Sequence, residues 1–131
     1  MKKLLLLPFL VFTLYFTSCE KDPAVIFPGT WSVESGGTFT FNADGTGYSL
    51  NTTQSMYQSS CALGDTSYFT WTATPNSTNN PRGTLRMDFL YDDMMTSCGY
   101  LEIAYKIKSK TKVQLGANVL GFDLSDDITK Q

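Results

Sequence analysis

Residues 37–47 read GTFTFNADGTG, in which an alternation of threonine and phenylalanine leads into a glycine-rich turn signal. In an extended strand, Phe39 and Phe41 point to one face and their threonine neighbours to the other. The Asp-Gly pair at 44–45 favours the left-handed backbone that a tight hairpin needs, and residues 48–50 can begin the returning strand. This segment therefore predicts an antiparallel hairpin with one aromatic face.

The same alternation of apolar and polar residues recurs through most of the chain, between clusters of Gly, Asn, Asp, Pro and Ser. The further inward positions that it predicts are Trp31 and Val33; Phe69, Trp71 and Ala73; Leu85, Met87 and Phe89; Leu101, Ile103, Tyr105 and Ile107; and Val113 and Leu115. A last strand is expected around Leu120, Phe122 and Leu124, followed by a polar tail over 126–131. Helical periodicity is nearly absent.

These runs predict about eight strands in hairpin succession, with no parallel crossover. An open meander has two edge strands, and closure into a barrel removes them. An immunoglobulin-like sandwich is the competing fold, because Cys61, Trp71 and Cys98 occur in its order. The second cysteine follows the first too soon for that fold, however, and Thr96 stands where it has a tyrosine. The sequence therefore favours an all-β fold, an antiparallel meander that closes into a small barrel.

The start of the chain combines two lysines at positions 2 and 3 with a short apolar run and Cys19. The run is far short of the roughly 20 residues that a spanning helix needs, and Pro8 interrupts it. Residues 1–18 resemble a bacterial lipoprotein signal peptide, in the looser form with serine before the cysteine that lipoproteins of Bacteroidetes-like bacteria have. The resemblance implies that Cys19 becomes the first mature residue and carries acyl chains. The alternative is that Cys19 is an incidental residue of a leader.

Domain boundaries follow from this reading. Residues 19–28 are interpreted as a solvated tether, and 29–131 have room for one domain only. A lipoprotein of this kind would be anchored to the outer membrane of the cell envelope through the acyl chains on Cys19. It would face either the periplasm or the cell surface.

Two cysteines remain in the mature chain, Cys61 and Cys98. In an oxidising compartment, a lone pair of cysteines is most simply a structural disulfide. The alternatives are a metal pair and a redox pair. A metal site would need His or further Cys, and the chain has no His. A redox site usually has the Cys-x-x-Cys spacing, which is absent.

Charge and composition exclude several function classes. Without the two leader lysines, eight basic residues stand against twelve acidic ones, a formal charge of −4. The basic residues form no dense cluster in sequence, which disfavours binding to nucleic acid and attraction to an anionic membrane surface. The absence of His excludes Ser-His-Asp and Cys-His catalysis. The adjacent carboxylates at 92–93 and 126–127 are interpreted as solvated charges, so no catalytic residue, cofactor or enzyme activity is predicted.

Several motifs carry a family resemblance. Gly29-Thr30-Trp31 is similar to the Gly-x-Trp of lipocalins, and it is followed by the hairpin 37–47 and by Phe-Thr-Trp at 69–71. This series resembles the small lipocalin-like lipoproteins of Bacteroidetes-type bacteria. The resemblance implies a small lipocalin-like barrel. One departure is that no Arg occurs in the last strands to stack on Trp31, because Arg82 and Arg86 lie in the middle of the chain.

The function expected from this reading is the binding or carriage of a small apolar ligand. The residues expected to line its cavity, or else to fill the core, are Trp31, Phe39, Phe41, Phe69, Trp71, Met87, Phe89, Ile103 and Tyr105. The alternative is an interaction protein with a filled barrel that contacts protein or glycan through loops, around Tyr57 or Met94. A third hypothesis is an inhibitor that inserts the loop at 76–81 into a partner's cleft.

Overall fold

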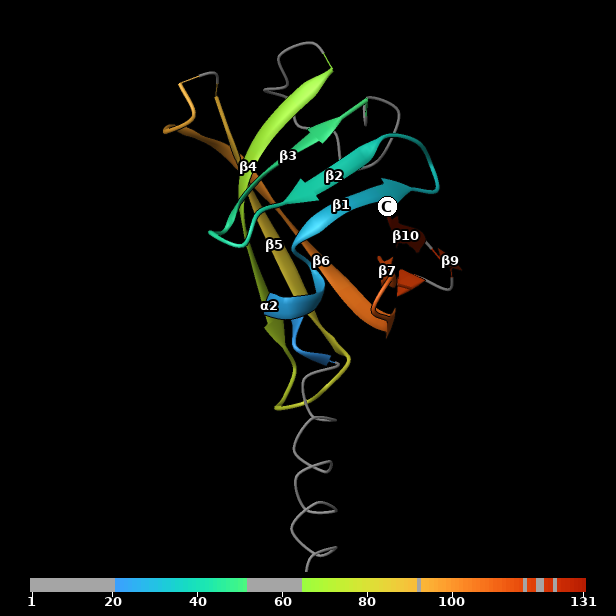
Figure 1. Cartoon of the computed structure of the whole chain (residues 1–131). Coiled ribbons are helices and arrows are strands. Elements are labelled where there is room, and N and C mark those ends of the chain that lie inside the picture. The colour runs from blue at the N-terminus through green and yellow to red at the C-terminus, as the bar shows by residue number, and fades with distance from the viewer. Residues whose placement is uncertain (1–20, 52–64, 92, 117, 120–121, 124) are drawn as a thin grey trace, which may run out of the picture.

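Eight strands form a closed antiparallel barrel in the order β1-β10-β7-β6-β5-β4-β3-β2 (Figure 1). The structure is a computed structural model, and it describes residues 21–51, 65–91, 93–116, 118–119, 122–123 and 125–131. The barrel strands are β1 (Gly29–Val33), β2 (Thr38–Phe41), β3 (Thr46–Leu50), β4 (Thr66–Pro75), β5 (Arg82–Leu90), β6 (Ser97–Ser109), β7 (Lys112–Leu115) and β10 (Asp126–Lys130). The predicted all-β meander of about eight strands, closing into a small lipocalin-like barrel, is confirmed.

The connections between successive strands alternate between the two ends of the barrel. One end, here called the α2 end, carries the one-turn helix α2 (Pro23–Ile26), the turn 42–45, the loop 76–81 and the turn 110–111. At the opposite end, here called the far end, β1, β3, β5 and β7 end and β2, β4, β6 and β10 begin. The far-end connections are the segments that join these strand ends in sequence, 34–37, 51–65, 91–96 and 116–125. In Figure 1, α2 and the orange 91–96 loop lie at opposite ends of the molecule.

The hairpin predicted at 37–47 forms from β2 and β3. Gly45 has φ +87°, and the carboxylate of Asp44 accepts a hydrogen bond from the Thr46 amide at 2.9 Å. Gly47, opposite Phe41, lies under the ring of Phe69, where an added Cβ would come within 2.5 Å of that ring. The glycine therefore leaves room for an aromatic side chain in the barrel.

The inward positions predicted from alternation are buried or half-buried. The fully buried set comprises Trp31, Val33, Phe39, Phe41, Phe69, Leu85, Met87, Phe89, Ile103, Tyr105, Ile107, Val113 and Leu115. Trp71, Ala73 and Leu101 are half-buried and pack against this core. The period-two pattern thus identified the interior faces of β1, β2 and β4 to β7, whereas the inward residues of β3 are Gly47 and the polar Ser49.

The end of the chain differs from the strand assignment predicted from sequence. The strand that closes the barrel is β10, in the segment that was expected to be a polar tail. Residues 118–119 and 122–123 pair with each other instead, as β8 (Asn118–Val119) and β9 (Phe122–Asp123), while Leu120 and Leu124 lie outside the described residues. The physical reason is Ile128, which is fully buried between its register partners Val33 and Val113.

The acidic pair at 126–127 also differs from the expected solvated charges. Asp126 is buried and accepts a hydrogen bond from the Ser35 hydroxyl at 2.5 Å. Asp127 points to the outer face and pairs with Lys108 at 3.0 Å and with Lys112 at 2.9 Å. Neighbours on a strand point to opposite faces, so β10 places one carboxylate inside and one outside.

The boundary of the expected tether is corrected as well. Asp22 caps α2 by accepting a hydrogen bond from the Ala24 amide at 2.9 Å. Ile26 and Phe27 are buried, and the Phe27 ring lies 5.3 Å from the ring of Tyr105. Two apolar side chains from the run 24–27 thus cover the α2 end of the barrel, and the folded domain begins at Pro23 rather than at Gly29.

Candidate functional site

The interior of the barrel holds the nine residues expected to line a cavity or fill the core. Eight of them are buried, and Trp71 is half-buried. The aromatic rings follow one another across β2, β4 and β5, with centroid distances of 5.6 Å for Phe41–Phe69 and 5.9 Å for Phe69–Phe89. These are contact distances for aromatic pairs. The structure therefore brings the predicted residues together as a packed aromatic cluster.

Trp31 anchors the closed α2 end. Its indole Nε1 donates a buried hydrogen bond of 2.7 Å to the carbonyl of Phe27. The Lys130 ammonium lies 5.1 Å from the centroid of the Trp31 ring and donates to the Ile26 carbonyl at 2.9 Å. A cation therefore stacks on Trp31 from the last strand. The sequence did not predict this contact, because the family resemblance implied an Arg on Trp31 and residues 126–131 were expected to form a tail.

Tyr105 brings one polar group into this interior. Its ring is buried, and its hydroxyl has no hydrogen-bond partner among the described residues. The hydroxyl lies over Gly83, where an added Cβ would come within 2.5 Å of it. Burial raises the pKa of the hydroxyl, and the nearby carboxylate of Asp22 raises it further. Tyr105 therefore stays protonated at neutral pH and is a hydrogen-bond donor in an aromatic environment.

The 91–96 loop at the far end is built around Asp93. Its carboxylate accepts hydrogen bonds from the amides of Met95 at 2.9 Å and Thr96 at 2.8 Å, and also from the Thr96 hydroxyl. These bonds, those from Thr96 above all, hold the pKa of Asp93 below its ordinary value. Met94, at φ +55°, is 55% exposed and Met95 is 86% exposed. An ordered loop thus presents two flexible apolar side chains to solvent.

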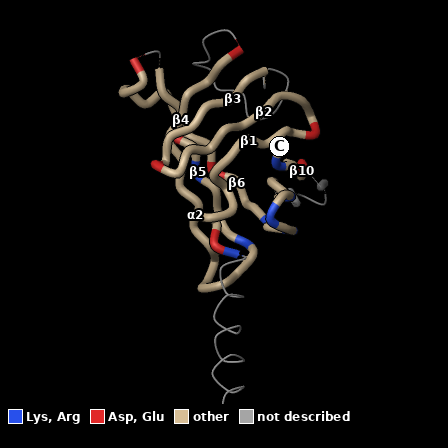
Figure 2. The backbone as a smooth tube through the Cα atoms, viewed as in Figure 1, with Lys and Arg blue, Asp and Glu red and all other residues tan. Residues whose placement is uncertain are grey.

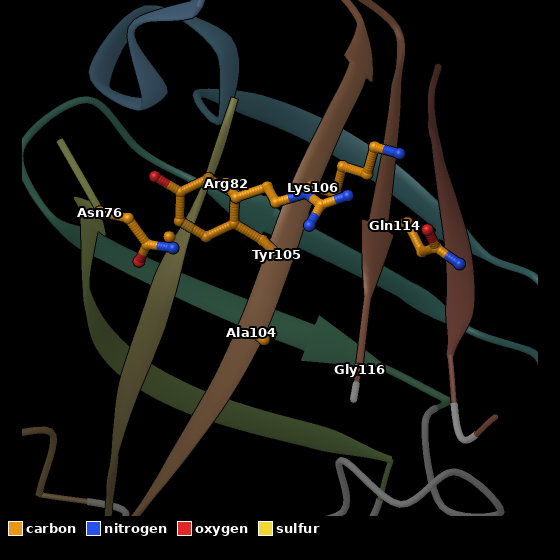
Figure 3. Close-up of a pocket in the computed structure, with 8 residues that line it drawn as sticks. Asn76, Arg82, Ala104, Tyr105, Lys106, Gln114 and Gly116 are labelled. Atoms are coloured by element: carbon orange, nitrogen blue, oxygen red, sulfur yellow. The ribbon is translucent and has the colours of Figure 1, made fainter. Parts of the chain in front are cut away.

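Two shallow grooves lie on the outer face of the barrel. One, of about 270 Å³, is lined by Asn76, Arg82, Lys106 and Gln114 together with parts of β5, β6 and β7 (Figure 3). The other, of about 290 Å³, is lined by residues of β1, β7 and β10, including Val33 and Asp127, and by Glu34 just after β1. Apart from Tyr105, which borders the first groove, none of the nine interior residues lines either groove.

The remaining predicted sites are partly outside the described residues. Cys98 on β6 is disulfide-bonded, whereas Cys61 lies outside the described part of the chain, so the pairing of the two stays a prediction. Cys19, Tyr57, Asp92 and the leader also lie outside it. Within the described residues, no three His, Cys, Asp or Glu side chains gather as metal ligands. No helix in the same part of the chain is long and apolar enough to span a membrane.

The fold and its packed interior define the class of the molecule, a small closed up-and-down β-barrel in which successive strands are neighbours. The chain matches no protein-family model, and neither a curated protein nor a solved structure is significantly similar to it. Its function is therefore argued from its own residues.

Proposed function

We propose that this protein is a lipid-anchored, non-enzymatic protein of the cell envelope that binds another protein through the far end of a filled barrel. Acylation of Cys19 in the outer membrane is supported by the leader pattern at 1–19 and by the resemblance to lipocalin-like lipoproteins. Binding of a protein partner is the function expected from sequence as the alternative to carriage of a small apolar ligand.

The observation that carries the proposal is the packed interior. A carrier needs space between its inward side chains, as ligand pockets of several hundred Å³ do. Here the inward rings of β2, β4 and β5 lie within contact distance of one another, and Phe27 covers the α2 end. These contacts favour side chains that fill the barrel over side chains that line a cavity.

The exposed loop supplies the surface for a partner. Tyr91, Met94 and Met95 are all more than two fifths exposed, and the Asp93 hydrogen bonds order the turn between them. Tyrosine and methionine are enriched at protein interfaces, and the flexible thioether adapts to irregular apolar surfaces. Because the loop is already ordered, binding costs less conformational entropy than it would for a loose segment.

The test uses the acylated protein in its own membrane. A photo-crosslinking amino acid is placed at Met95 in the far-end loop and, as the matched control, at Thr78 in the α2-end loop. We expect Met95 to give one reproducible protein adduct that Thr78 does not give. Asp93→Ala, which removes the carboxylate that orders the loop, should weaken the adduct severalfold while the thermal midpoint changes little. Equal adducts at both positions would contradict the proposed binding surface.

Native mass spectrometry of the same preparation tests the competing function. We expect the acyl mass on Cys19 and no other small molecule. An apolar compound that is released only on denaturation would establish a carrier and reject the filled barrel. An adduct of glycan rather than protein at Met95 would reject the protein partner.

A further inference from the structure

Basic and acidic residues are distributed unevenly between the two ends of the barrel. Of the eight Lys and Arg residues that follow position 20, seven lie at the α2 end or in the strand segments next to it, and Arg86 is the exception. The seven are Lys21, Arg82, Lys106, Lys108, Lys110, Lys112 and Lys130. The far-end connections contain no Lys or Arg in sequence, and their described residues include Glu34, Asp65 and Asp93. The α2 end also carries two acids, Asp22 and Asp44, so its cations outnumber its acids. Figure 2 shows acidic segments in the far-end loops, and basic segments together with an acidic one near α2.

Two of these cations face each other without an acid between them. Arg82 on β5 and Lys106 on β6 are register partners, and neither side chain has an ion pair among the described residues. Four residues along the same strand pair, Arg86 opposes Glu102 and is paired with it at 3.2 Å. Like charges directly opposite on a sheet repel each other, so an anion between Arg82 and Lys106 would relieve the repulsion.

The neighbours of this pair are also hydrogen-bond donors. Gln114 on β7 is the register partner of Lys106, and the backbone N–H of Asn76 donates to the Arg82 carbonyl at 2.9 Å, which places Asn76 beside Arg82. The row Asn76, Arg82, Lys106 and Gln114 therefore crosses three strands and lines the groove in Figure 3. The Gln114 side-chain nitrogen already donates to the Ser125 hydroxyl at 2.8 Å. The two cations beside the Asn76 side-chain amide suit an oxyanion such as a phosphate group.

The length of the tether places this row close to the membrane. Because the folded domain begins at Pro23, only residues 20–22 separate it from Cys19. Four extended residue steps reach at most about 14 Å. Charges interact over a screening length of about 8 Å at physiological salt. An acyl anchor on Cys19 would thus hold the α2 end, and no other part of the barrel, against the lipid headgroups.

We propose that the α2 end is a docking surface for lipid phosphate groups, with Arg82 and Lys106 as its centre, which holds the barrel upright on the membrane. The far-end loop at 91–96 then points away from the bilayer. This proposal rests on the proposed acylation of Cys19. It also revises the expectation from sequence that an anionic membrane would not attract the protein, because the fold gathers basic residues that are far apart along the chain.

The experiment uses acylated protein reconstituted into phosphatidylcholine vesicles with and without phosphatidylglycerol. A fluorescent donor is attached to a cysteine introduced at Thr78, in the α2-end loop, or at Met95, in the far-end loop, and the acceptor is a headgroup-labelled lipid. We expect severalfold stronger energy transfer from position 78 than from position 95 in the anionic vesicles. The difference should shrink in neutral vesicles and at high salt, because salt screens the attraction.

The matched variants separate charge from tether length. The triple change Lys21→Gln, Arg82→Gln and Lys106→Gln should reduce the difference between positions 78 and 95, since each cation near an anionic surface shifts such an equilibrium about fivefold. The charge-preserving set Lys21→Arg, Arg82→Lys and Lys106→Arg should restore it. Two outcomes with acylated protein would overturn this proposal alone. One is equal energy transfer from positions 78 and 95, and the other is a difference between these positions that the triple change to Gln leaves unchanged. Protein without an acyl mass on Cys19 would overturn the anchoring together with it.

Discussion

Single residues at the α2 end connect segments that are distant in sequence. Lys130, near the end of the chain, bonds to the carbonyl of Ile26 and stacks on Trp31. Trp31 in turn bonds to the carbonyl of Phe27. Both carbonyls lie at the C-terminal end of α2, where backbone acceptors have no partner within so short a helix. Two side chains of the barrel therefore satisfy the end of the helix that covers it.

The role of the Trp31 hydrogen bond can be measured directly. We expect Trp31→Phe to lower the free energy of unfolding by about 1–3 kcal/mol, because the buried Phe27 carbonyl loses its donor. Trp71→Phe is the matched control, since the indole of half-buried Trp71 bonds to the Asn42 and Thr46 carbonyls at an exposed turn. Denaturant unfolding compares the two variants. Equal losses would show that the Phe27 carbonyl does not depend on Trp31.

At the scale of elements, the barrel depends on two short segments, β10 and α2. β10 contributes Ile128 as its buried apolar side chain, yet it pairs with β1 on one side and with β7 on the other. On its outer face Asp127 bonds to Lys112 and Lys108, which hold the pKa of Asp127 below its ordinary value. Helix α2 and the residue that follows it contribute Ile26 and Phe27 as buried apolar side chains. Each segment gains its stability from where it binds rather than from its own composition.

The assignment of 126–130 as the closing strand makes a clear prediction. Ile128→Ala should lower the free energy of unfolding by about 2–5 kcal/mol, because it leaves a cavity between Val33 and Val113. The exposed neighbour Thr129→Ala should change it by less than about 0.5 kcal/mol. Chemical denaturation of both variants is the measurement. Similar small effects would mean that this segment is a tail after all.

At the scale of the whole molecule, the two ends of the barrel differ in both charge and chemistry. The α2 end is basic and closed by apolar side chains, and the far end is acidic and presents the methionine loop. Strand β6 is the longest of the barrel and spans from one end to the other. It carries Cys98 at its far-end start and Lys106 near the α2 end. The two proposed surfaces therefore lie on opposite ends of one rigid sheet.

The disulfide should stabilise the molecule as a whole. A bond between Cys98 and Cys61 would close a long loop and contribute roughly 4 kcal/mol to the free energy of unfolding in the chain-entropy model. We expect reduction of the disulfide to lower the free energy of unfolding by a similar amount. The Cys98→Ser variant should have the same free energy of unfolding as the reduced protein, and reductant should not change it further. Free-thiol labelling should find both cysteines protected until reduction. A Cys61 that reacts in the unreduced protein would rule out the pairing.

The sequence by itself determined the fold class, the inward faces of β1, β2 and β4 to β7, and the hairpin whose turn is 42–45. These follow from short-range physics, because side-chain alternation and turn backbone depend on a few adjacent residues. The tertiary structure alone decided which segment closes the barrel, where the domain begins and where the charges gather. Ile128 is a single apolar residue in a polar segment, and Phe27 ends an apolar run of four residues, 24–27, that is too short to show a period. The burial of both depends on partners far along the chain. Arg82 and Lys106 likewise become neighbours only through the register of β5 on β6.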